Sequence, residues 1–116
     1  MAGKINAMLA AVLLVGAASA ADAASFDCTR ARAPDERAIC ADRGLNDQDV
    51  TMSVMLKIGG HFVGMGARGA MQDDQIAWLK ARRACGANRE CLTQSYDGRI
   101  ATLQKVIDAA ASHGPF

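Results

Sequence analysis

The segment QIAWLKARRACGANREC, residues 75–91, holds the clearest structural signal in this 116-residue chain. Several of its side chains recur at spacings of three and four, which places them on one side of a helix. These residues are Gln75, Trp78, Leu79, Arg82 and Cys85. We therefore predict a helix from about Met71 to Cys85, ended by a turn at Gly86.

A second helix is predicted directly after this turn. Asn88 has the side chain of a good helix N-cap, because its oxygen can accept a bond from an unpaired backbone N–H in the first turn. An apolar stripe at helical spacing follows it. The stripe consists of Leu92, Tyr96, Ile100, Leu103, Val106 or Ile107, and Ala110.

Toward the N-terminus, the sequence indicates a short helix from Pro34 to about Arg43. Proline suits the first helical position, and the acidic residues Asp35 and Glu36 complement the positive end of the helix dipole. Gly44 is a typical stop.

A further helix is expected to start after Asn46, which can cap it, with Asp49 three residues later. Its apolar face comprises Val50, Met52, Met55, Leu56, Ile58 and Val63. Five glycines then occur in the eleven residues from Gly59 to Gly69. Since each glycine costs a helix interior about 1 kcal/mol relative to alanine, we expect a frayed helix end followed by a mobile loop.

Strand patterns are missing from the sequence, since no stretch alternates cleanly between apolar and polar residues. The pattern therefore favours an all-α protein, a small bundle of about four helices.

The first 20 residues have the pattern of a secretion signal. Lys4 gives a positive start, residues 5–16 are almost entirely apolar, and Ala18-Ser19-Ala20 suits cleavage after Ala20. The apolar run is shorter than the roughly 20 residues of a membrane span, and no cysteine follows it closely enough for lipid attachment. We expect residues 21–116 to form a single domain in the periplasm or outside the cell, without a membrane anchor.

The charge is balanced, with 13 basic and 12 acidic residues, and loss of Lys4 with the signal would leave twelve of each. Nucleic acids and anionic membranes are recognised by clustered positive charge. The composition therefore argues against both kinds of partner, and a partner has to be sought elsewhere.

Cys28, Cys40, Cys85 and Cys91 are the four cysteines of the chain. In an exported protein, an even number of cysteines indicates disulfides, and four allow three pairings. We favour Cys28 with Cys40 and Cys85 with Cys91, because each bond would fasten neighbouring segments. The long-range pairings stay open on grounds of stability. The chain has no CxxC motif and no histidine near the cysteines, so the sequence does not indicate a redox or metal site.

These features together resemble a known family, the LprI-type lysozyme inhibitor, N-terminal domain. The matching segments, which span nearly all of residues 21–116, are Phe26-Asp27-Cys28, Glu36 to Cys40, Leu45 to Asp49, and Gln75, Trp78, Leu79 and Arg82 followed by Cys85 and Cys91. The resemblance implies an exported, helical, disulfide-bonded domain that inhibits lysozyme.

Trp78 and Arg82 lie one helical turn apart, so the guanidinium could stack on the indole. It could also reach a carboxylate from another helix, such as Asp27, Glu36 or Asp49. Two interpretations follow. Either the pair belongs to the core and holds the fold, or it is exposed and forms a binding hot spot.

Other chemistry has less support in the sequence. Met52, Met55, Met65 and His61 could be ligands for Cu(I), although methionines at helical spacing usually fill a core. No serine, threonine or cysteine stands beside a plausible histidine base, so we expect neither an enzyme nor a cofactor.

The leading hypothesis is an exported protein that blocks a lysozyme, a cell-wall muramidase. Its donors toward the carboxylates of the enzyme would be Arg68, Lys80, Arg83 and Arg89, with Arg68 and Arg89 forming one surface. The alternatives are a structural or chaperone-like envelope stress protein and a periplasmic copper-binding protein.

Overall fold

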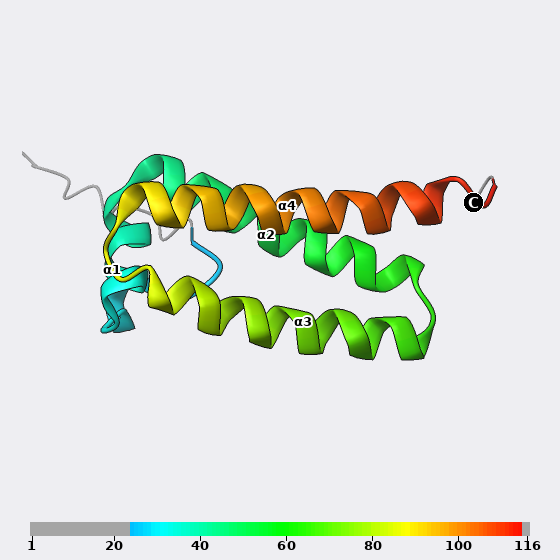
Figure 1. Cartoon of the computed structure of the whole chain (residues 1–116), viewed down its shortest axis with the longest axis horizontal. Helices are drawn as coiled ribbons and strands as arrows, with labels where there is room; N and C mark the ends of the chain where they lie inside the picture. The colour runs from blue at the N-terminus through cyan, green and yellow to red at the C-terminus, as the bar shows by residue number, and fades with distance from the viewer. Residues whose placement is uncertain (1–23, 115–116) are drawn as a thin grey trace, which may run out of the picture.

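The computed structural model describes residues 24–114, and Figure 1 shows their arrangement as an elongated helical bundle. A 3₁₀ turn at Cys28–Arg30 precedes four α-helices. These are α1 (Pro34–Ala41), α2 (Arg43–Phe62), α3 (Met65–Ala84) and α4 (Arg89–Ala111). The predicted all-α class with four helices is confirmed, and the described residues contain no strand.

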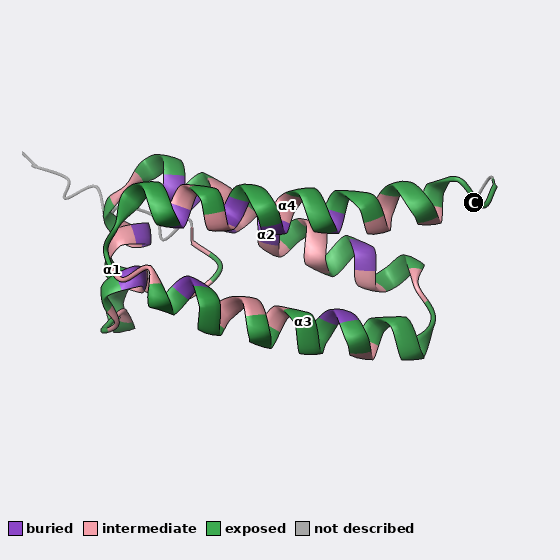
Figure 2. Cartoon of the chain, in the orientation of Figure 1, coloured by how far each residue is buried: buried purple, intermediate pink, exposed green. Residues whose placement is uncertain are grey.

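The core lies mainly between α2 and α4, which run side by side, while α1 closes one end of the bundle (Figure 1). Figure 2 shows buried positions along the facing sides of these helices. The buried apolar residues are Ile39, Leu45, Met52, Met71, Leu92, Tyr96 and Leu103. Three of them, Leu92, Tyr96 and Leu103, belong to the stripe predicted for the last helix.

The start of α2 differs from the prediction. Asp42 is the N-cap, because its backbone is extended and its Oδ1 accepts a bond from Leu45 N at 3.0 Å. The expected cap, Asn46, instead lies buried within the helix. Gly44 does not stop α1 but sits in the first turn of α2, where a Cβ would come within 3.3 Å of Arg89 Nη2.

The prediction of a frayed helix end and a mobile loop between Gly59 and Gly69 is also wrong. The α2 helix continues through Gly59 and Gly60 to Phe62, and α3 begins at Met65, after a break of two residues. Gly59 is buried, and a Cβ there would lie 3.0 Å from Met71 Cε. Packing at Gly59 therefore outweighs its low helix propensity, whereas Gly60, Gly64, Gly66 and Gly69 have open space around them.

The link between α3 and α4 agrees with the prediction. Gly86 adopts a positive φ of 54°, a conformation open to glycine without steric cost. Asn88 caps α4, because its side-chain oxygen accepts a bond from Cys91 N at 2.9 Å.

Both favoured disulfides, Cys28–Cys40 and Cys85–Cys91, are present, and together they fasten the end of the bundle that contains α1. Two disulfides indicate an oxidising, extracytoplasmic environment. The predicted signal peptide lies outside the described residues. Among helices within residues 24–114, none is long and apolar enough to cross a membrane.

Candidate functional site

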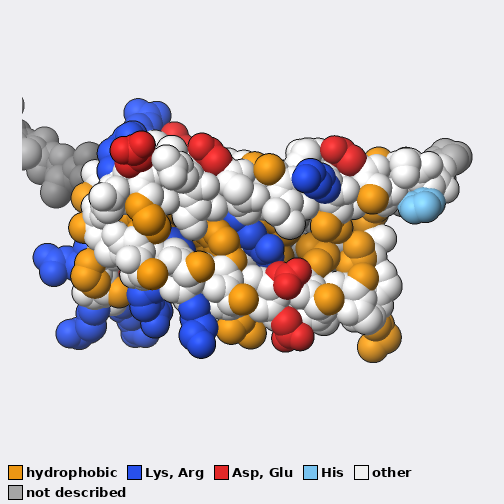
Figure 3. Space-filling view, viewed as in Figure 1, with side chains coloured by type: hydrophobic (Ala, Val, Ile, Leu, Met, Phe, Trp, Pro, Cys, Tyr) orange, Lys and Arg blue, Asp and Glu red, His pale blue; other side chains and the backbone are white. Residues whose placement is uncertain are grey.

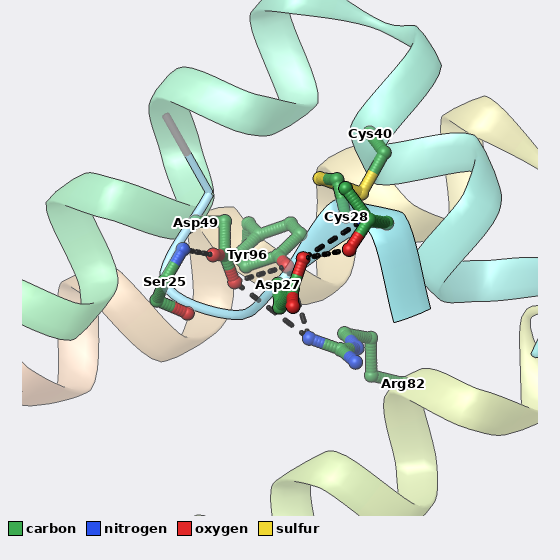
Figure 4. Close-up of a disulfide and its surroundings, with 8 residues drawn as sticks. Ser25, Asp27, Cys28, Cys40, Asp49, Arg82 and Tyr96 are labelled. Carbon is green, nitrogen blue, oxygen red and sulfur yellow. Dashed lines mark hydrogen bonds and ion pairs between the residues drawn. A yellow bond between two sulfur atoms is a disulfide. The ribbon is translucent and has the colours of Figure 1, made fainter. Parts of the chain in front are cut away.

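Arg82 lies at the centre of a buried polar group that we call the arginine cluster: Arg82, Asp35, Asp49 and Tyr96 (Figure 4 shows Arg82, Asp49 and Tyr96). Arg82 Nε donates to Asp35 Oδ2 at 3.0 Å and Nη1 donates to Tyr96 Oη at 3.2 Å. Tyr96 in turn donates to Asp49 Oδ1 at 2.8 Å, which lies 3.7 Å from Arg82 Nη1. One cluster thus joins all four helices.

Asp49 also holds the segment before α1. Its Oδ2 accepts a bond from Ser25 N at 2.7 Å, which ties this segment to α2 (Figure 4). The next residue, Phe26, places its ring 5.7 Å from the guanidinium carbon of Arg82. The cluster and the Cys28–Cys40 disulfide therefore anchor the same short segment.

The predicted stacking of Arg82 on Trp78 is confirmed, with 5.6 Å between the guanidinium carbon and the ring centroid. The half-buried indole also donates to Ser95 O at 3.1 Å and packs edge-on against Tyr96. This geometry favours the interpretation in which Trp78 and Arg82 hold the fold.

Among the carboxylates expected for Arg82, only Asp49 contacts it. Asp27 instead accepts bonds from Thr29 and pairs with Arg30. The main partner is Asp35, the neighbour of the expected Glu36. The sequence missed Asp35 because its acidic character also suits a solvated helix start, and only the packing of α1 against α3 distinguishes the two roles.

Burial dominates the electrostatics of the cluster. Removal from solvent raises the pKa of Tyr96 well above its ordinary value of 10.0, and the neighbouring Asp49 carboxylate raises it further. The phenol therefore stays protonated and acts as a hydrogen-bond donor at neutral pH.

Arg99 is a second buried cation, which the sequence analysis did not single out. Its Nε donates to Gln75 Oε1 at 2.9 Å, and desolvation lowers its pKa. Gln75 Nε2 faces Met52 Sδ at 3.3 Å. The spacing of Tyr96, Arg99 and Leu103 on one face of α4 was the available signal for its burial.

The proposed partner-binding residues do not form one surface. Arg68 lies in the first turn of α3, whereas Lys80 and Arg83 lie near its other end and Arg89 begins α4. At 20 residues, α3 is about 30 Å long, so Arg68 and Arg89 stand at opposite ends of the bundle. The expected joint surface of Arg68 and Arg89 is therefore wrong.

Three of these four cations, Lys80, Arg83 and Arg89, lie at the end of the bundle that contains the two disulfides. We call Arg37, Lys80, Arg83 and Arg89, all exposed, the basic end. Figure 3 shows Lys and Arg side chains gathered on the α1 side of the molecule. Arg37, on α1, was not among the expected residues, and it lines a hollow of about 410 Å³ together with Ala87 of the turn.

Arg89 is paired within the protein. Its Nε donates to Asp42 Oδ2 at 2.5 Å, and this bond is the main cause that lowers the pKa of Asp42 and raises that of Arg89. Lys80 and Arg83 are therefore the better candidates for contact with a partner.

A groove lies between α2 and α3 toward the opposite end. Its volume is about 430 Å³, and we call it the α2–α3 groove. The residues that line it are Ser53, Leu56, Lys57, Gly60, His61, Arg68, Met71 and Gln72.

The residues considered as alternative copper ligands are not brought together. Met52 is buried against Gln75, nine residues from His61 along α2, which corresponds to about 13 Å. Met65 is 88% exposed at the start of α3. Within residues 24–114, no group of three or more His, Cys, Asp or Glu side chains could hold a metal ion.

Comparison with known proteins adds no relative: no family model, curated protein or solved structure matches this chain. The resemblance to the LprI-type domain stays a prediction from the sequence motifs.

Proposed function

We propose that this chain is an exported binding protein that inhibits a lysozyme through its basic end. The family resemblance supplies the partner class, and the position of Lys80 and Arg83 supplies the surface. Both side chains are exposed in the last two turns of α3, next to the disulfide that links α3 to α4.

The chemistry of a muramidase cleft suits such a surface. Glycoside hydrolases use a pair of catalytic carboxylates. Lysine and arginine donate charge-assisted hydrogen bonds to carboxylates, and these are stronger than bonds between neutral groups. Lys80 and Arg83 would compete with substrate by pairing with these acids.

Rigidity supports the same assignment. Both disulfides and the arginine cluster lie at the basic end, so its side chains project from a fixed backbone. A preorganised surface loses less conformational entropy on binding. Because the chain is nearly neutral overall, affinity has to come from this local fit rather than from long-range attraction.

The test is residual muramidase activity after incubation of the oxidised protein, residues 21–116, with lysozymes of several classes. We expect concentration-dependent inhibition of at least one class. Full activity of every class at saturating protein would rule out the proposed function.

A further inference from the structure

The α2–α3 groove is cationic at its mouth and apolar inside. Lys57, His61 and Arg68 contribute basic groups, and the described residues that line it include no acid. Leu56 and Met71 contribute the apolar surface. Its volume of about 430 Å³ falls within the range of small-molecule sites.

Arg68 is held in place at this mouth. Its Nε donates to Gly60 O at 2.7 Å, a contact from α3 back to α2. A guanidinium has five N–H donors, so this bond leaves its terminal amino groups able to bind a carboxylate in a bidentate manner. A side chain already fixed in this way loses less freedom when a ligand binds.

The surrounding backbone adds positive potential. Arg68 lies in the first turn of α3, a turn with no acidic residue and no side-chain cap at Gly64. Helix N-termini usually carry acids because their dipole is positive. Residues 50–72 contain no Asp or Glu, and the next acids along α3, Asp73 and Asp74, lie more than one helical turn beyond Arg68.

A second hollow adjoins the groove. Its volume is about 340 Å³, and it shares Ser53 and Leu56 with the groove. Its lining adds Met52 and Leu79, and also the charged residues Glu36, Asp49, Arg82 and Arg83. An amphiphile with its carboxylate at Arg68 could therefore lay its apolar chain along Leu56 as far as Ser53, where the charged lining of the second hollow begins.

From this geometry we propose that the α2–α3 groove binds a small anionic amphiphile, with its carboxylate on Arg68 and its apolar chain on Leu56 and Met71. Charge complementarity selects the head group, and the apolar surface between the helices selects the chain. This site is separate from the basic end and goes beyond the proposed inhibition of lysozyme.

Decanoate, below its micelle concentration, is a suitable probe in isothermal titration calorimetry with the oxidised protein. We expect saturable binding with one site per chain. Decanol, which lacks the charge, and acetate, which lacks the chain, are expected to bind at least about tenfold more weakly, because each loses one of the two contributions. Equal binding of either analogue, or no binding of decanoate, would overturn the proposal.

Two variants locate the ligand. Arg68→Gln should weaken decanoate binding at least about tenfold, and Ser53→Leu should block the junction of the two hollows. Lys105→Gln, which removes an exposed charge on α4, is the matched control and should leave binding unchanged. Unchanged binding in both groove variants, with melting curves that show a folded protein, would refute the site.

Discussion

Arg82 Nε and Asp35 Oδ2, 3.0 Å apart and both buried, join α3 to α1 across 47 residues of sequence. Removing one partner of a buried pair leaves the other charge unpaired and typically costs about 3–5 kcal/mol. We expect Arg82→Met to lower the free energy of unfolding by this amount in urea titrations followed by circular dichroism.

The neighbouring Arg83 provides the control for this change. It is exposed, so Arg83→Met should alter the free energy of unfolding by no more than about 0.5 kcal/mol. A loss below about 1 kcal/mol in Arg82→Met would show that the arginine cluster does not hold the helices together.

The raised pKa of Tyr96 predicts how the free energy of unfolding depends on pH under alkaline conditions. Because the pKa of Tyr96 is higher in the folded than in the unfolded protein, the protonated phenol stabilises the fold. This contribution is complete below the unfolded-state pKa of 10.0 and is lost as pH rises toward the folded-state pKa. Tyr96 is the single tyrosine of the chain, so tyrosinate absorbance reports on it alone.

We expect this absorbance to appear together with unfolding rather than at the ordinary tyrosine pKa. Tyr96→Phe should be less stable at neutral pH by about 1–3 kcal/mol, because Asp49 loses a donor. It should also lose less further stability than wild type above pH 10.0. Ionisation of Tyr96 in a folded protein near pH 10.0 would contradict its burial.

Gly59 and Gly60 are consecutive residues of α2, but we expect alanine substitutions at the two positions to change stability differently. No atom lies within 4 Å of a Cβ at Gly60, so Gly60→Ala should stabilise the protein by up to about 1 kcal/mol through helix propensity. At Gly59 the new methyl would meet Met71 Cε at 3.0 Å, which offsets that gain. Thermal melting should rank Gly60→Ala above Gly59→Ala, and the reverse order would refute the packing described for Met71.

Trp78 contributes through both its ring and its indole N–H. Trp78→Ala removes the contacts with Arg82 and Tyr96 and the bond to Ser95 O, and should cost about 3 kcal/mol or more. Trp78→Phe keeps an aromatic ring and should cost less. If Trp78→Ala left the melting temperature unchanged, the interpretation of Trp78 as a core residue would fail.

Local signals in the sequence predicted the features that depend on neighbouring residues. Asn88 caps α4 through a residue three positions away, and the Cys85–Cys91 disulfide spans a single turn. Both follow from short-range geometry, which spacing in the sequence expresses directly.

Features that depend on distant contacts could not be predicted in this way. Gly59 looked like a helix breaker, yet its lack of a side chain admits Met71 from α3. Asp35 and Glu36 are equivalent as helix-start acids, and only the packing of α1 selects Asp35 as the partner of Arg82. The same limitation led to the incorrect grouping of Arg68 with Arg89.

The most direct test of the proposed function compares two double variants with wild type in the muramidase assay. Lys80→Gln/Arg83→Gln and Arg68→Gln/Lys105→Gln each remove one lysine and one arginine, so their net charges are equal. We expect the first to weaken inhibition at least about tenfold, since each charge-assisted bond contributes about 1.5–3 kcal/mol, and the second to inhibit like wild type. Equal inhibition by both variants would contradict the assignment to the basic end, and a wild-type protein that inhibits no lysozyme would contradict the function itself.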